Sequence, residues 1–187
     1  MSGFEQKGQL KSRKNRFRNS RIGASKDPKE SIKDLLADAA LLLVTAQPEL
    51  ALVRARKALR LSQASGELTP GSLPALHLLG EISIQLGDHE AAHSYFMDAA
   101  ALDPDGRVSS ETGDGSSKFF WLAQLSDEGG ASSIRWFERG ADILRREIAE
   151  AEKWKSSLEA QSIIEAKKIK LASALCGMAE VYMTDLS

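Results

Sequence analysis

The chain has 187 residues, of which 42% are apolar, so it can form one domain with a sizeable hydrophobic core. Its formal net charge of −1 hides an uneven distribution, because residues 1–26 contain eight Lys or Arg and one acid, whereas residues 27–187 contain 17 basic and 25 acidic residues. The chain has a single cysteine, Cys176, which excludes an intrachain disulfide. Its longest apolar run, residues 39–44, is too short to span a membrane. We therefore expect a soluble intracellular protein with no membrane partner.

Residues 1–26 form a basic segment that is poor in apolar side chains. Such a segment cannot bury enough surface to offset the entropy of ordering, so we predict a disordered tail. Its basic centre, KSRKNRFRNSR at residues 11–21, has three interpretations: a nuclear import signal, an arm that contacts phosphates, or a solvated tail without a specific partner. The candidate residues for import or phosphate contact are Lys11, Arg13, Lys14, Arg16, Arg18 and Arg21.

Residues 27–187 are predicted to form an ordered, all-α domain. The first helix is expected to begin near residue 32, with Ser31 as its N-cap and Asp34 three residues later. Aliphatic residues then recur at steps of three and four, and no stretch alternates with period two. Two loops interrupt this pattern, at residues 65–74 and 103–118. The second is rich in Gly, Ser and Asp, so we predict that it is solvated and mobile.

Residues 73–106 resemble the tetratricopeptide repeat, a helix-turn-helix unit of the same length. Each diagnostic position has a physical reason. Small residues let two antiparallel helices approach closely, a glycine lets the chain turn between them, an aromatic ring fills the space between them, and a proline stops the second helix. The one departure is Ser83, where the family usually has Tyr. The matching residues are Leu76, Leu79, Gly80, Gly87, Ala92, Phe96, Ala99 and Pro104.

Three further units follow from the same pattern, near residues 32–65, 118–145 and 172–187. The first of them departs from the family at Asp38 and Gln63. Residues 143–170 are rich in helix formers, so we predict that the two helices they join are lengthened into a protruding hairpin. The unit at 172–187 lacks its second helix, so we expect an exposed apolar face and a chain that is a fragment of a longer protein. The residues that place these units are Leu35, Ala39, Ala51, Ala55, Ala58, Ala123, Ser133, Phe137, Gly140, Leu175, Met178, Ala179 and Tyr182.

Residues 89–93 read HEAAH, which is the helical zinc-protease signature. A site of that type needs a third protein ligand, but the one other histidine, His77, lies upstream on a different predicted helix. We therefore interpret HEAAH as the start of a repeat's second helix. No catalytic residue, metal site or cofactor is predicted, and Cys176 is interpreted as a small helical residue rather than a nucleophile.

The resemblance to tetratricopeptide repeats implies a scaffold that binds segments of other proteins along a concave groove lined by first helices. The residues at the groove positions are polar to acidic, which suits a basic peptide. Leu36 and Ala40 stand where repeats that clamp acidic chaperone tails carry Lys and Asn, so that partner class is disfavoured. In the alternative interpretation, several of the acids only solubilise the protein. The candidate groove residues are His77, Glu81, Gln85, Gln124, Asp127, Glu128, Glu180 and Asp185.

Residues 27–187 are also similar to the fungal tetratricopeptide chaperones dedicated to large-subunit ribosomal protein four. The similarity is carried by DPKESIKDLLADAALLL, KFFWLAQLSDEGGASSIRWFERGADILRREI and ALCGMAEVYMTDLS. It implies capture of the basic internal loop of that newly made protein, protection of the loop from aggregation and stray RNA, escort into the nucleus and release on the pre-ribosome.

The same resemblance implies a location in both cytoplasm and nucleus, with an import receptor reached through the client or the tail. It implies no direct contact between the body of the protein and nucleic acid. Two alternatives stay open from the sequence: a generic tetratricopeptide scaffold in another assembly, and a metal-dependent hydrolase.

Overall fold

The computed structural model describes residues 30–63, 66–108, 115–126, 130–153 and 158–185. Their regular structure consists of helices, with no strand in these ranges. None of these helices combines the length and the apolarity that a bilayer crossing requires. The helices are α1 (Ile32–Val44), α2 (Pro48–Ser62), the 3-10 turn η1 (Pro70–Ser72), α3 (Leu73–Gln85), α4 (His89–Leu102), α6 (Ser117–Gln124), α7 (Gly130–Lys153) and α8 (Leu158–Thr184).

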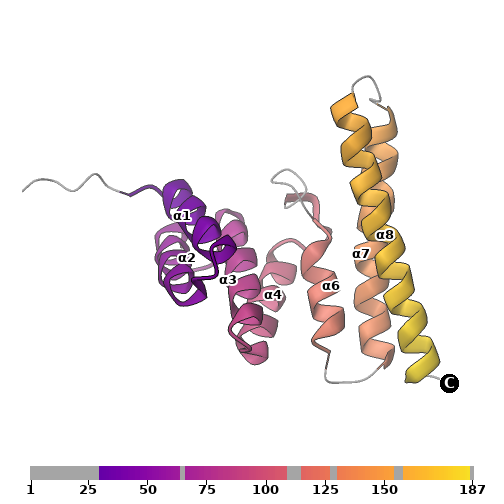
Figure 1. Ribbon diagram of the computed structural model, residues 1–187, viewed down its shortest axis with the longest axis horizontal. Helices are drawn as coiled ribbons and strands as arrows, with labels where there is room; N and C mark the ends of the chain where they lie inside the picture. The colour runs from indigo at the N-terminus through magenta and orange to yellow at the C-terminus, as the bar shows by residue number, and fades with distance from the viewer. Residues whose placement is uncertain (1–29, 64–65, 109–114, 127–129, 154–157, 186–187) are drawn as a thin grey trace, which may run out of the picture.

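The helices stack in chain order into an elongated row, from α1 and α2 at one end to α7 and α8 at the other (Figure 1). α1 packs against α2, α3 against α4, α6 against α7 and α7 against α8, while α2–α3 and α4–α6 contacts join successive pairs. The described chain is therefore a solenoid of helix-turn-helix units, and the all-α prediction is confirmed.

Local sequence signals set the helix ends. The Ser31 hydroxyl accepts a hydrogen bond from the Asp34 backbone N–H (3.1 Å), and the Asp34 carboxylate accepts one from the Ser31 N–H (3.4 Å), so the predicted cap is a full capping box. Between α3 and α4 the chain turns at Gly87, whose φ of +74° favours glycine. Asp88 then caps α4 by accepting from the Ala91 N–H (3.0 Å).

Glycines set the closest helix crossings. A Cβ added at Gly80 would lie 2.4 Å from Cζ of Phe96, a fully buried ring on α4. A Cβ at Gly140 would lie 2.4 Å from the Phe120 ring, so α6 and α7 also cross where a glycine of one helix contacts an aromatic ring of the other. The predicted role of Gly80 as a close-contact residue is confirmed, because any side chain there would displace the ring that fills the space between the helices.

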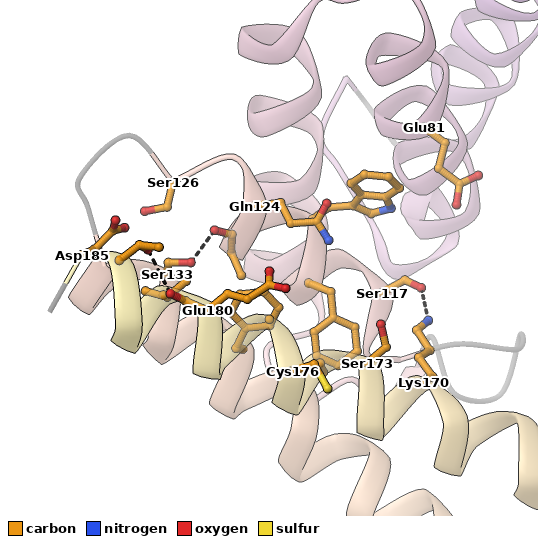
Figure 2. Close-up of a pocket in the computed structure, with 18 residues that line it drawn as sticks. Glu81, Ser117, Gln124, Ser126, Ser133, Lys170, Ser173, Cys176, Glu180 and Asp185 are labelled. Atoms are coloured by element: carbon orange, nitrogen blue, oxygen red, sulfur yellow. Dashed lines mark hydrogen bonds between the residues drawn. The ribbon is translucent and has the colours of Figure 1, made fainter. Parts of the chain in front are cut away.

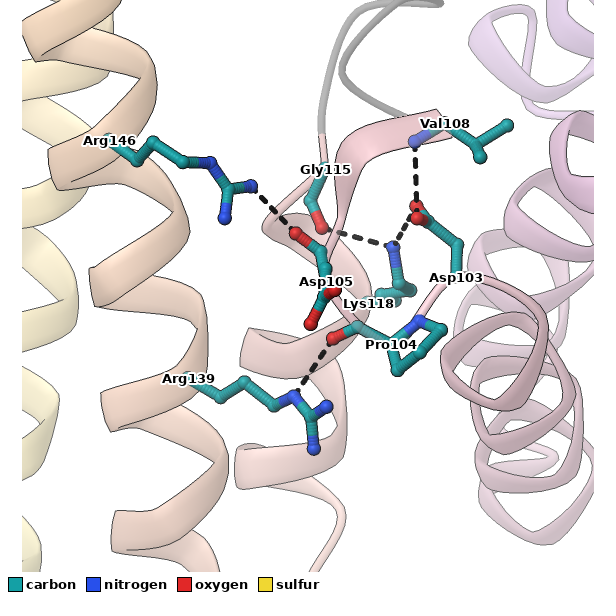
Figure 3. A network of polar contacts seen from close by, with 8 residues as sticks. All are labelled: Asp103, Pro104, Asp105, Val108, Gly115, Lys118, Arg139 and Arg146. Atoms are coloured by element: carbon teal, nitrogen blue, oxygen red, sulfur yellow. Dashed lines mark hydrogen bonds and ion pairs between the residues drawn. The ribbon is translucent and has the colours of Figure 1, made fainter.

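The prediction of a solvated, mobile loop at residues 103–118 is wrong at both of its ends. Asp103 and Lys118 are 3% and 0% exposed and form an ion pair, with 3.0 Å between Lys118 Nζ and Asp103 Oδ2 (Figure 3). Lys118 also donates to the Gly115 carbonyl oxygen (3.1 Å), and Asp103 accepts from the Val108 N–H (3.1 Å). Burial of these charges is tolerated because each is paired and further hydrogen-bonded. Residues 109–114 of the predicted loop lie outside the described ranges.

Two arginines of α7 hold the chain that follows α4. Arg139 Nε donates to the Pro104 carbonyl oxygen (2.9 Å), and Arg146 donates to the Asp105 carbonyl oxygen (2.6 Å) (Figure 3). A Cβ at Gly106 would meet the Ile143 side chain at 2.7 Å. The end of the second unit is therefore anchored to the third, and α7 is fixed relative to α4.

α7 and α8 are the lengthened helices that the sequence predicts, and they extend as a hairpin well beyond the other helices (Figure 1). Two ion pairs join them, Glu147 with Lys167 and Glu152 with Lys168, the second at 2.8 Å. The hydrogen bond to the Glu152 carboxylate raises the pKa of the Lys168 ammonium. The hairpin is thus an internally braced part of the solenoid.

α8 is one continuous helix through residues 172–184, where the sequence places the start of a fourth unit. Leu175, Tyr182 and Met183 of this helix are apolar and exposed. The helix packs on α7 through Ala174, Met178 and Val181.

Candidate functional site

A groove of about 870 Å³ lies where α3, α6, α7 and α8 face one another (Figure 2). The groove is lined from α3, α6 and α8, which stand in the places of the predicted first helices of three successive units. The lining residues are Glu81 of α3, Ser117, Phe120, Trp121, Ala123 and Gln124 of α6, Ser126 just after it, Ser133 and Phe137 of α7, and Lys170, Ser173, Ala174, Cys176, Gly177, Glu180, Val181, Thr184 and Asp185 of α8 and its end.

The structure brings four of the predicted groove residues together and leaves two outside. Glu81, Gln124, Glu180 and Asp185 all line the groove, although they come from three different helices. The two that do not line it are His77, which is half-buried with its ring edge-on to the Phe96 ring (centroids 6.3 Å apart), and Gln85, which is exposed. Asp127 and Glu128 lie outside the described residues, as does the basic tail.

Aromatic rings form the floor of the groove. The Phe120 and Phe137 rings lie 6.2 Å apart and are almost fully buried. A Cβ at Gly177 would lie 2.9 Å from the Phe137 ring, so glycine at this position lets α8 approach the floor. The Ser133 hydroxyl donates to the Ala123 carbonyl oxygen (2.6 Å), which ties α7 to α6 beside the rings. The floor is therefore rigid and apolar.

Charge changes along the groove. Glu180 and Asp185 are exposed at the end of α8, and neither carboxylate forms an ion pair with another described residue. At the other end, the Lys170 ammonium donates to the Ser117 hydroxyl and lies 5.7 Å from the centroid of the Phe120 ring (Figure 2). The groove is acidic at one end and carries a cation at the other.

Sequence reasoning missed Lys170 and Ser117. Lys170 precedes residue 172, where the repeat numbering starts the fourth unit, and it belongs to the groove because α8 is continuous across that boundary. The available signal was the unbroken run of helix formers ahead of residue 172, which favours one helix over two.

The HEAAH stretch begins α4. His89 is the first residue of the helix and is exposed, His93 is half-buried, and Ala92 is fully buried in the core against α6. Among the residues that the structure describes, no three His, Cys, Asp or Glu side chains come together to hold a metal ion. The stretch begins the second helix of the α3–α4 pair, and its residue Ala92 packs in the core as the repeat pattern predicts.

Comparison with known proteins agrees with this architecture. The family profile of the tetratricopeptide repeat matches residues 73–105. The chain therefore contains a tetratricopeptide repeat at residues 73–105, within the helical solenoid described above. A solved structure of residues 1–338 of the assembly chaperone of RpL4 (Acl4) is 40% identical, with a TM-score of 0.74 over 82% of this chain and 55% of that one.

Two curated relatives carry a matching name. The probable assembly chaperone of rpl4 from Emericella nidulans is 40% identical over 62% of this chain, and the one from Schizosaccharomyces pombe is 33% identical over 60%. These matches span 30% and 29% of the relatives' own lengths. The chain is thus similar in sequence and in fold to assembly chaperones of Rpl4, over part of their length.

Proposed function

We propose that this protein is a dedicated chaperone that holds the basic internal loop of newly made ribosomal protein Rpl4 and delivers it to the pre-ribosome. The observation that carries the proposal is the similarity to the solved assembly chaperone of RpL4, at 40% identity and a TM-score of 0.74. The proposed activity is binding, without catalysis. The groove supplies the chemistry that such a client needs.

The dimensions of the groove suit an extended peptide. From Lys170 to Asp185 the helix rises about 1.5 Å per residue, or roughly 22 Å in all. An extended chain covers about 3.3 Å per residue, so roughly seven client residues could lie along this length. The exposed carboxylates of Glu180 and Asp185 would attract Lys and Arg side chains, and the Phe120 and Phe137 floor would take the apolar parts of those side chains.

Calorimetric titration of the protein with the isolated Rpl4 internal loop tests the proposal. We expect one-to-one binding that weakens as salt rises, because the attraction is between exposed charges. Glu180→Lys turns an attraction into a repulsion and should weaken binding about tenfold. The matched control is Glu150→Lys, which makes the same charge change at an exposed position of α7 outside the groove. Absence of binding by the unmodified protein would refute the proposal.

Cys176 offers a second readout in the unmodified chain, because it is the single cysteine, is exposed and lines the groove. A client bound in the groove should slow alkylation of this thiol by a maleimide. Strong binding without any protection of Cys176 would place the client elsewhere on the protein.

The basic tail has a separate proposed role. We propose that the protein is present in both cytoplasm and nucleus, and that residues 1–26 contribute to import rather than to client binding. Removal of these residues should leave the loop affinity unchanged and should alter the nuclear distribution of the protein. Loss of client affinity in the purified truncated protein would place the tail in the binding site instead.

A further inference from the structure

Trp121 occupies an unusual position between the core and the groove. Its indole is stacked on the Phe96 ring, with centroids 6.0 Å apart and planes 11° apart. The residue is partly buried and lines the groove together with Glu81 and Gln124. Phe96 is itself fully buried, and Trp121 packs against the core cluster that contains it, while the part of Trp121 that stays accessible lines the groove. Packing against the core therefore fixes the orientation of the indole.

We propose that Trp121, Glu81 and Gln124 form a subsite that selects an arginine side chain of the bound peptide. A guanidinium is planar and weakly hydrated, so it can stack on the indole while its N–H groups donate to a carboxylate and an amide oxygen. A lysine ammonium is a strongly hydrated point charge, and it cannot stack and make a two-pronged contact at once. The subsite deepens the proposed function and relies on it only for the identity of the peptide.

Other kinds of side chain fit these three residues less well. An apolar side chain on the indole would remove water from the Gln124 amide without offering it a hydrogen-bonding partner, which is costly. An acidic side chain would be repelled by Glu81. Only a cation with a flat face and several donors satisfies both the ring and the polar groups.

Two short peptides decide the matter independently of Rpl4. They share one sequence of small residues interrupted by basic positions, which are all arginine in one peptide and all lysine in the other. For the unmodified protein we expect calorimetry to give a five- to tenfold tighter affinity for the arginine peptide, roughly the value of one partly desolvated cation–π contact. In Trp121→Leu this ratio should fall to near one.

The matched control is Trp136→Leu. Trp136 is also partly buried and stacked on a core ring, Phe119, with centroids 6.0 Å apart, but it does not line the groove. It should lose a similar amount of packing and keep the arginine preference. Glu81→Gln should weaken the binding of both peptides, because it removes a charge that both of them use.

The outcomes separate the subsite from the proposed function. Equal affinity for the two peptides, or a preference that persists in Trp121→Leu, overturns the arginine subsite even if the Rpl4 loop binds. A preference for the arginine peptide that disappears only in Trp121→Leu supports the subsite even if the Rpl4 loop fails to bind. In that case the proposed function is refuted and the subsite is not.

Discussion

The buried ion pair of Asp103 and Lys118 joins the end of the second repeat to the start of the third. We predict that Lys118→Met destabilises the protein strongly. Methionine keeps most of the side-chain volume and the contact with the Phe119 ring, from whose centroid the Lys118 ammonium is 4.9 Å away. The main effect of the substitution is therefore electrostatic, because it leaves the carboxylate of Asp103 buried without a cation.

The size of the loss follows from the burial of both partners. Removing one member of a buried ion pair typically costs about 3–5 kcal/mol, since the charge that remains has lost its water and its partner. Asp103 keeps the hydrogen bond from the Val108 N–H, which places the expected loss near the lower end of that range. For a chain of this size, 3 kcal/mol corresponds to a fall in Tm of roughly 6–12 °C.

Thermal and urea unfolding, followed by the helical circular dichroism signal, measure this loss. Asp103→Asn/Lys118→Met removes both charges and retains an acceptor for the Val108 N–H, so we expect the double variant to be more stable than Lys118→Met alone. Arg145→Met breaks the exposed pair with Asp142 and should change stability by less than about 0.5 kcal/mol. The reasoning is refuted if Lys118→Met behaves like Arg145→Met, or if the double variant is the less stable of the two.

Three other substitutions test the crossings and turns by urea unfolding. Gly80→Ala should lower the free energy of unfolding by about 1 kcal/mol, because overpacking against Phe96 outweighs the gain in helix propensity. Adding Phe96→Leu to the same chain should recover most of this loss. A Gly80→Ala variant that is more stable than the unmodified protein would contradict the close crossing. Ser31→Ala should lower the free energy of unfolding by about 1 kcal/mol because it removes the N-cap of α1, and Ser31→Thr should lower it less because threonine can still act as the cap. Equal losses in the two variants would argue against the cap. Gly87→Ala should cost about 1–2 kcal/mol because of its positive φ, and Gly87→Asn less.

The repeat architecture could be predicted from sequence because its requirements are steric and local. The space between two adjacent helices determines the residue types at Gly80, Ala92 and Phe96, and a positive φ determines that of Gly87. Each of these residue types therefore appears at a fixed position in the repeat. The long α7–α8 hairpin was predictable for a similar reason, since a run of helix formers without a breaker continues the helix. These features need no knowledge of distant contacts.

The buried ion pair and the lining of the groove depend on contacts between distant residues, which produce no regular spacing in the sequence. Asp103 and Lys118 are separated by a Gly- and Ser-rich stretch that has the composition of a solvated loop, and only the packing of α4, α6 and α7 buries them. The groove depends on how successive units rotate, so Glu81 lines it while His77, one turn earlier on α3, turns toward the Phe96 ring. Lys170 enters from outside the predicted unit for the same geometric reason.

The stacking of helices in chain order also bears on how this protein is made. Each helix packs mainly on the helices just before and just after it, so the closing loops are short and cost little entropy. α1 and α2 can pair, and α3 and α4 can dock on them, before α7 and α8 have been synthesised. The solenoid can therefore fold progressively from the N-terminus during translation, and the groove, which needs α3 and α8 together, is completed last.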